Sequence, residues 1–217
     1  NLDAKGGKNY NSRVEFKREI DAISKNLEID EISILALNYF YEISVACTSI
    51  VTLDHKKQPI LARNFDFLFY DMLKNMYTDV TFKSKRYGNV VCGIIPGLLG
   101  VFTCMKPGKF AVSLNSRDSE ADFFKTFSKN VGKGMLPTTW MLRNAVIRSE
   151  NYLALKTRIE TMEIASPAYI IIAGTKPTEG AVITRNSGET ESALKKLSES
   201  SNNFLVKGNT DLNTDKN

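Results

Sequence analysis

Cys47-Thr48-Ser49-Ile50-Val51-Thr52-Leu53 is the stretch from which the fold can be worked out. It is rich in β-branched residues and half alternates between apolar and polar side chains, which indicates a β-strand. Residues 54–59 that follow are polar and end in a proline, which is typical of a turn. Residues 60–64 then have the pattern of an extended strand again. The sequence therefore predicts an antiparallel hairpin that begins at Cys47.

The register of this hairpin decides which side chains meet. If its turn is centred near His55 and Lys56, antiparallel pairing places Cys47 beside Arg63 and Asn64, with Asp66 just beyond. A thiol, a guanidinium, an amide and a carboxylate would then lie close together. We expect these four functional side chains to converge at one end of the hairpin.

The rest of the chain alternates between helical and extended patterns. Residues 14–27 and 31–41 predict two amphipathic helices, the second with Asp30 as its N-cap. After the hairpin, an antiparallel meander is expected, and then helices pack on the sheet. The predicted strands are residues 78–82, 89–95, 98–104, 110–114, 169–174, 181–185 and 204–206. Helical patterns over residues 120–130 and 138–163 predict two or three helices. These patterns predict an α+β fold.

Composition limits the possible partners. The 217 residues carry a net charge of +5, which favours anionic surfaces, so an anionic membrane surface stays open as a partner. Because the basic residues are scattered and no aromatic RNA-binding motif is present, we expect no nucleic-acid partner. No apolar run reaches the roughly 20 residues of a membrane span. The polar first residues contain no visible signal peptide.

Cys47 needs a base if it is to act as a nucleophile. The chain has one histidine, His55, and its place in the turn puts it about eight strand positions from Cys47, too far for a Cys-His dyad. With no Cys/His cluster either, we expect no metal and no cofactor. The remaining base is an α-amine, which Cys47 would carry if the Ala46–Cys47 bond were cut. The plain alternative is that Cys47 is a buried cysteine without a chemical role. If Cys47 is reactive, only Cys92 and Cys104 remain to form a disulfide.

The Cys47–Val51 stretch, followed by a turn and by Arg63-Asn64-Phe65-Asp66-Phe67, resembles the acid ceramidase and N-acylethanolamine-hydrolysing acid amidase family. Further resemblance extends along most of the chain. It includes residues 38–42, 97–100, 106–110, 165–169 and 179–186. The resemblance implies an N-terminal-nucleophile hydrolase fold, a four-layer αββα sandwich of two antiparallel sheets between helices. It also implies cleavage at Ala46–Cys47 into a helical small subunit, residues 1–46, and a catalytic subunit, residues 47–217.

The resemblance also implies roles for individual residues. Cys47 would be the nucleophile, and Arg63 and Asp66 would orient its free amine and the substrate amide, although a plain surface ion pair is the alternative for these two. Asn209 would help form the oxyanion hole, with a plain turn as its alternative. The substrate-binding residues would be Asn64, Leu98, Leu99 and Asn115, although the apolar ones fit a sheet core equally well.

The implied reaction is hydrolysis of a fatty-acid amide, either an N-acylethanolamine or a ceramide, in a lysosomal or secretory lumen. Two departures from the family pattern bear on it. Ser116 stands where the family has an acidic residue, and the chain ends soon after Asp211, so a C-terminal part of the family fold is expected to be missing. These departures favour a catalytically inactive lipid-binding or regulatory paralogue as one alternative. A bile-salt or penicillin amidase, which a substrate profile would distinguish, is the other.

Overall fold

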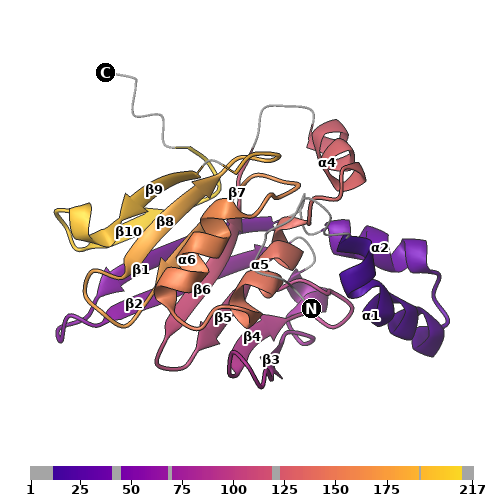
Figure 1. Ribbon diagram of the computed structural model, residues 1–217, viewed down its shortest axis with the longest axis horizontal. Coiled ribbons are helices and arrows are strands. Elements are labelled where there is room, and N and C mark those ends of the chain that lie inside the picture. The colour runs from indigo at the N-terminus through magenta and orange to yellow at the C-terminus, as the bar shows by residue number, and fades with distance from the viewer. Residues whose placement is uncertain (1–11, 41–44, 68–69, 119–122, 191, 212–217) are drawn as a thin grey trace.

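The computed structural model describes residues 12–40, 45–67, 70–118, 123–190 and 192–211, and its elements are shown in Figure 1. The helices are α1 (Ser12–Leu27), α2 (Glu31–Phe40), α3 (Tyr70–Leu73), α4 (Phe123–Gly132), α5 (Thr138–Ile147), α6 (Tyr152–Thr161) and the short η2 (Leu197–Glu199). The strands are β1 (Val45–Leu53), β2 (Pro59–Phe67), β3 (Thr78–Phe82), β4 (Val90–Ile94), β5 (Thr103–Lys106), β6 (Phe110–Ser116), β7 (Ala168–Ala173), β8 (Gly180–Arg185), β9 (Ser192–Lys196) and β10 (Phe204–Lys207).

The strands form two antiparallel sheets. One has three strands in the order β10-β1-β2, and the other has seven in the order β3-β4-β5-β6-β7-β8-β9. The large sheet is a meander, because every strand pairs with its neighbour in the sequence. This confirms the predicted α+β fold with two stacked antiparallel sheets.

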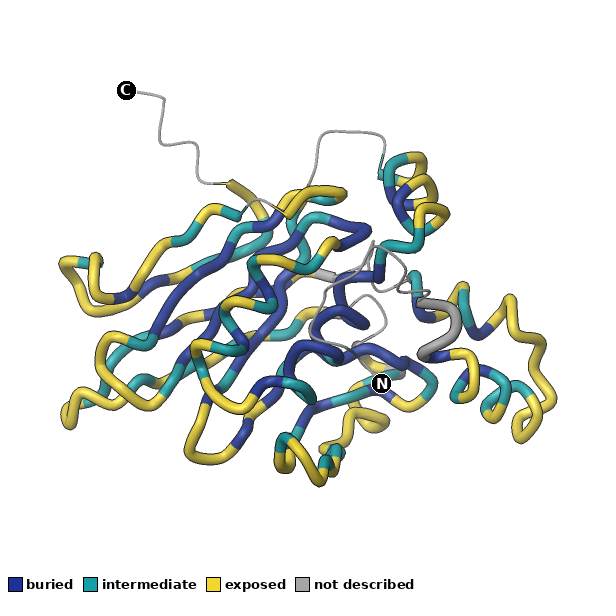
Figure 2. Tube along the Cα trace, in the orientation of Figure 1, coloured by how far each residue is buried: buried dark blue, intermediate teal, exposed yellow. Residues whose placement is uncertain are grey.

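The layers explain where the core lies. Helices α5 and α6 cover one face of the seven-stranded sheet, while β1 and β2 lie behind it (Figure 1). Burial is deepest along β7, where all six residues are buried, and continues into β8 and α5 (Figure 2). Two apolar clusters fill the layers, a large one between helices and sheet and a smaller one, around Val51, Tyr169 and Ile171, between the sheets. Such a stack fixes β1 firmly against the large sheet.

The helical part before Cys47 packs at the side of the sandwich (Figure 1). Asp30 accepts a hydrogen bond from the backbone N–H of Ser33 at 2.9 Å, which confirms it as the predicted N-cap of α2. The ring of Phe16 on α1 lies 4.4 Å from that of Trp140 on α5, and both side chains are buried. Aromatic burial of this kind anchors α1 to the helices that cover the large sheet.

The hairpin is present, but its predicted register is wrong by one residue. Cys47 pairs with Phe65 and Ser49 with Arg63, whereas the prediction placed Cys47 opposite Asn64. The loop between the strands runs over residues 54–58, and the side chain of Asp54 accepts hydrogen bonds from the backbone of Lys56 and Gln58. The turn is thus centred on Lys56. A shift of one residue exchanges the two faces of a strand.

One other expectation needs correction. Residues 98–102 are buried but not extended, and the strand starts only at Thr103. The helical pattern over 138–163 forms two helices, because the chain turns at 148–151 and Asn151 caps α6 by accepting a hydrogen bond from Ala154 N. Strand β9 was not predicted. Of the predicted helix over 120–130, residues 120–122 lie outside the described part.

The outer face of the three-stranded sheet carries apolar side chains. Ile50, Ile60, Phe204 and Val206 are each more than a third exposed. Among the described residues no helix covers this face (Figure 1). None of the described helices is both long and apolar enough to cross a membrane.

Candidate active site

Cys47 and Arg63 meet on the inner face of the β1–β2 hairpin. Side chains alternate along β1, so that Cys47, Ser49 and Val51 are buried while Ala46, Thr48 and Ile50 are exposed. On β2 the same inner face carries Arg63, whose Nη2 donates a hydrogen bond to the sulfur of Cys47 at 2.7 Å. The first sequence-predicted contact of the site is therefore present.

Arg63 is held in place from the large sheet. Its Nη1 donates to the carbonyl of Phe102 and to the hydroxyl of Thr103, both at 3.0 Å. Its Nε is buried and has no hydrogen-bond partner within the described part of the chain. The guanidinium thus points at the sulfur in a fixed orientation and keeps one buried donor free.

Asn209 completes the contacts around Cys47. Strand β10 pairs with β1 only from Ser49 to Thr52, so the ladder stops before it reaches Cys47. Beyond the end of β10, the side-chain Oδ1 of Asn209 accepts a hydrogen bond from the backbone N–H of Cys47 at 2.6 Å. An amide side chain therefore takes the place of a strand partner at the nitrogen that would become the catalytic amine.

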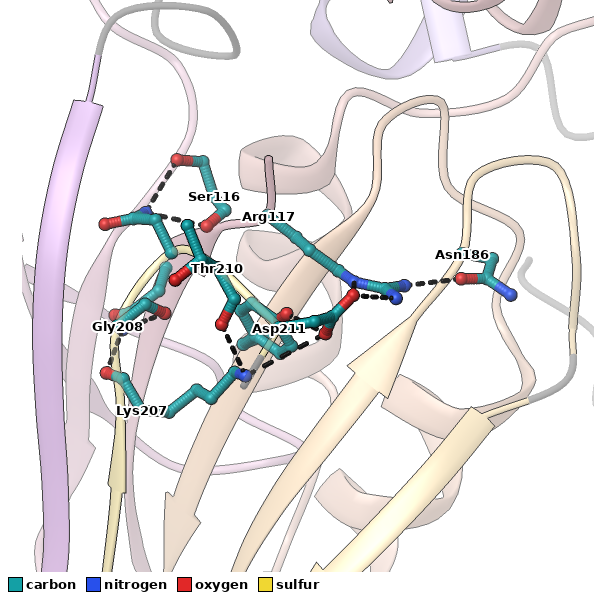
Figure 3. Close-up of polar contacts among 10 residues, drawn as sticks. Ser116, Arg117, Asn186, Lys207, Gly208, Thr210 and Asp211 are labelled. Atoms are coloured by element: carbon teal, nitrogen blue, oxygen red, sulfur yellow. Dashed lines mark hydrogen bonds and ion pairs between the residues drawn. The ribbon is translucent and has the colours of Figure 1, made fainter. Parts of the chain in front are cut away.

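Ser116 explains the orientation of Asn209. The Nδ2 of Asn209 donates to the carbonyl of Ser116 at 2.7 Å and to its hydroxyl at 2.9 Å, contacts that are drawn in Figure 3. In this uncleaved chain both amide hydrogens point to Ser116. The predicted oxyanion-hole role of Asn209 stays a prediction.

Asn64 and Asp66 do not join this group. Both are exposed on the outer face of β2, where Nδ2 of Asn64 donates to the carboxylate of Asp66 at 2.9 and 3.1 Å. The predicted convergence of four side chains is therefore wrong in this chain, because the register shift turns these two away from Cys47. The carboxylate is still near enough to act on the thiol through its charge.

The other predicted substrate residues lie in the interior. Leu98 and Leu99 belong to the main apolar cluster, and the backbone N–H of Leu99 donates to Asn38 on α2. Asn115 is fully buried, accepts from Ser49 Oγ at 2.7 Å, and donates to the carbonyl of Lys207 at 2.8 Å. These contacts tie β1, β6 and β10 together behind Cys47.

A pocket of about 350 Å³ opens beside Arg63. Most of its wall is apolar. Its lining residues are Arg63, Phe65, Leu73, Lys74, Tyr77, Ile95 and Thr103. The ring of Tyr77 lies against β4 where Gly93 has no side chain, since a Cβ there would come within 1.7 Å of the Tyr77 hydroxyl. The pocket can therefore hold an apolar group next to the Cys47–Arg63 pair.

The surroundings of Cys47 shift the pKa of its thiol. Burial raises its pKa above the ordinary value, and the charge of Asp66 adds to this, while the Arg63 guanidinium acts in the opposite direction. A protonated thiol needs a base before it can attack. His55 cannot serve, because it is exposed in the hairpin turn, as predicted.

The structure also places the remaining cysteines and the predicted cleavage position. Cys92 and Cys104 form a disulfide across β4 and β5, which leaves Cys47 as the free thiol. Ala46 is exposed on β1 directly before buried Cys47. Among the described residues there is no group of three or more His, Cys, Asp or Glu side chains that could hold a metal ion.

Comparison with known proteins gives this arrangement a context. The solved structure of the Caenorhabditis elegans N-acylethanolamine-hydrolysing acid amidase ortholog matches with a TM-score of 0.68 and 32% sequence identity, over 76% of this chain and 71% of that one. The chain belongs to the family of N-acylethanolamine-hydrolysing acid amidases and acid ceramidases. Its fold is accordingly the N-terminal-nucleophile hydrolase fold. No model of a protein family matches the chain.

Curated family members agree. The Cavia porcellus N-acylethanolamine-hydrolysing acid amidase is 31% identical over 173 residues, and the Homo sapiens acid ceramidase is 29% identical over 189 residues. Each match covers 80% of this chain, but only 49% and 48% of the relative. The chain thus spans about half the length of these relatives.

Two residues of the site were not found from the sequence. Thr103 holds Arg63, and Tyr77 lines the pocket against Gly93. A threonine and a tyrosine at strand ends carry no local signal of function. Only the pairing of Thr103 with Gly93 across β4 and β5, which needs the register, brings them to Arg63.

Proposed function

We propose that this chain is the part of a fatty-acid amide hydrolase in which Cys47 is the nucleophile. The observation that carries the proposal is the 2.7 Å contact between Arg63 Nη2 and the sulfur of Cys47, at the edge of an apolar pocket. The names of its relatives, N-acylethanolamine-hydrolysing acid amidase and acid ceramidase, point to the substrate class, an acyl chain joined to an amine through an amide.

Activation would start with hydrolysis of the Ala46–Cys47 peptide bond. The new α-amine of Cys47 would then lie where the backbone nitrogen now donates to Asn209, and it would be the base that the site otherwise lacks. An α-amine has a pKa near 8, low enough for a fraction to be neutral in mild conditions. Because the α-amine of Cys47 would accept the proton of the Cys47 thiol, the reaction would need no histidine.

Hydrolysis then takes two steps. The sulfur of Cys47 bonds to the amide carbon, its proton passes to the α-amine, the carbon–nitrogen bond breaks, and the leaving amine takes that proton. Water next bonds to the thioester carbon, the carbon–sulfur bond breaks, and the thiol regains a proton.

The Nε–H of Arg63 is buried and has no hydrogen-bond partner among the described residues, so it is a donor that a substrate acceptor could satisfy. The relatives' description as acid enzymes supports an acidic lumen as the working compartment.

The test is capture of the acyl-enzyme. The acid-treated chain is mixed briefly with an N-acylethanolamine or a ceramide, quenched in acid and digested. We expect the acyl mass on the peptide that starts at Cys47, and none in Cys47→Ser treated in the same way. A chain that binds these lipids but never carries an acyl group would instead be the lipid-binding paralogue, and the proposal would be wrong.

A further inference from the structure

The segment that carries Asn209 is held by an ion pair on its far side. Asp211 is half exposed, yet its Oδ2 accepts from Arg117 Nη2 at 2.6 Å and from Arg117 Nε at 3.2 Å. The hydroxyl of Tyr169, on β7, donates to the other carboxylate oxygen. Figure 3 shows the carboxylate of Asp211 facing the guanidinium of Arg117. Paired donors from one guanidinium fix orientation as well as position.

Arg117 is itself anchored at several points. Its Nη1 donates to the side chain of Asn186 at 2.5 Å, and its backbone N–H donates to the carbonyl of Pro167 at 3.3 Å. The guanidinium carbon lies 5.6 Å from the centre of the Tyr169 ring. The cation is therefore a fixed point of the large sheet rather than a mobile surface side chain, and its own side chain is only 20% exposed.

Lys207, at the start of the segment 207–211, also holds this segment in place. Its ammonium donates to the carbonyl of Thr210 at 2.7 Å and lies 3.9 Å from the centre of the Tyr169 ring. It is also 3.9 Å from the carboxylate of Asp211. Residues 207–211 thus form a closed loop with both ends on Tyr169, and Asn209 sits at its middle.

Asn209 is also aligned through the backbone. Its carbonyl accepts from the N–H of Asp118 at 2.9 Å, one residue beyond Arg117. Ser116, one residue before Arg117, takes both side-chain hydrogens of Asn209. Each of residues 116–118 is therefore hydrogen-bonded to Asn209 or Asp211, so movement of the Arg117–Asp211 pair would also move Asn209.

We propose that Arg117 and Asp211 are positioning residues, which act through Asn209 to hold the backbone nitrogen of Cys47. This rests on the proposed function, because the nitrogen matters as the future catalytic amine. The contacts of the pair are with Tyr169, Asn186 and the segment itself, whereas Asn209 makes the contact with Cys47 at 2.6 Å. Their effect is on geometry, not on the reacting atoms.

A double-mutant cycle tests this. Arg117→Gln, Asp211→Asn and the double variant are compared with the wild type in the full chain. We expect each single change to lower kcat by about tenfold with little change in KM, and the double variant to lose no more than either single one. Arg117→Lys should keep only part of the wild-type kcat, since an ammonium cannot make the paired contact with the Asp211 carboxylate. Lys156→Gln breaks a similar ion pair on α6 and should leave kcat unchanged.

A second readout does not need activity. The Cys47 amide donates to Asn209 Oδ1, so its hydrogen exchange in the uncleaved Cys47→Ala background reports directly on that contact. We expect faster exchange at residue 47 in Arg117→Gln and Asp211→Asn, and no change in Lys156→Gln. Unchanged exchange and kcat, or losses that simply add in the double variant, would overturn the proposal. An inactive wild type with the expected exchange pattern would contradict the proposed function alone.

Discussion

The guanidinium of Arg63 lies 2.7 Å from the sulfur of Cys47, although the two residues are not directly paired in the β1–β2 ladder. The contact runs diagonally across the inner face of the hairpin, and Thr103 of the other sheet fixes the far side of the guanidinium. Both sheets therefore meet at the candidate nucleophile.

Removing this guanidinium should impair the thiol. Because the Arg63 guanidinium acts most strongly against burial in lowering the pKa of Cys47, Arg63→Ala should move the midpoint of the pH dependence of Cys47 alkylation upward. It should also reduce kcat/KM by about a hundredfold, the size of effect seen when a preorganised donor is lost. Arg18→Ala, an exposed cation on α1, is the matched control. An unchanged alkylation profile in Arg63→Ala would contradict the assigned contact.

The wall of the pocket should set acyl selectivity. Gly93→Ala places a methyl group 1.7 Å from the present Tyr77 hydroxyl, so the ring must move into the pocket and KM should rise for every acyl chain. Tyr77→Ala enlarges the pocket and should shift kcat/KM toward bulkier acyl groups. A panel of amides with graded acyl lengths measures both. Gly132→Ala, which meets no neighbour, should behave as the wild type.

The charge of Asp211 should make stability depend on pH. Arg117 and then Tyr169, through their hydrogen bonds, hold the pKa of this carboxyl below its usual range, and the Tyr169 pKa is raised to about 12, mainly by burial. A lowered folded-state pKa stabilises the fold above the unfolded pKa, and that contribution disappears as pH falls through the folded pKa. Because Asp211 is half exposed, the loss should stay below about 1 kcal/mol.

Urea unfolding of wild type and Asp211→Asn checks this. We expect wild type to be the more stable at neutral pH and the two to converge in strong acid. A gap that persists in acid would show that the carboxylate charge is not the cause.

The helical segment should remain bound after cleavage. Arg143 on α5 donates to both carboxylate oxygens of Glu19 on α1, at 2.6 and 2.8 Å, and also lies over the ring of Phe16. Arg143→Ala should weaken this attachment by about 2 kcal/mol. Size-exclusion chromatography of the cleaved protein should then show residues 1–46 separating from the rest. Coelution as in the wild type would count against this contact as the anchor.

The sequence predicts local structure better than long-range contacts. The β-branched run after Cys47 identifies the hairpin, and Asp30 identifies the start of α2, because both depend on neighbouring residues. The register was missed because it depends on Asp54, whose side chain closes a loop centred on Lys56. The resulting shift of one residue in the register places Asp66 on the outer face of the hairpin.

The contact of Asn209 with Cys47 could not be predicted from local sequence patterns. Asn209 is 162 residues from Cys47, and no periodicity links the two. Only the resemblance to the family pointed to it. The contacts that hold it, from Ser116 and through Asp211, follow from the packing of β6 and β7 against the segment after β10, which sequence patterns do not determine.

The most direct test of the account is the mass of the intact chain after incubation in mildly acidic buffer, compared with Cys47→Ala. The account predicts that the wild type yields a fragment whose first residue is Cys47 with a free α-amine, while Cys47→Ala stays whole. A wild-type chain that remains intact, or a Cys47→Ala chain that is cut at the same bond, would contradict the claim that Cys47 becomes an N-terminal nucleophile.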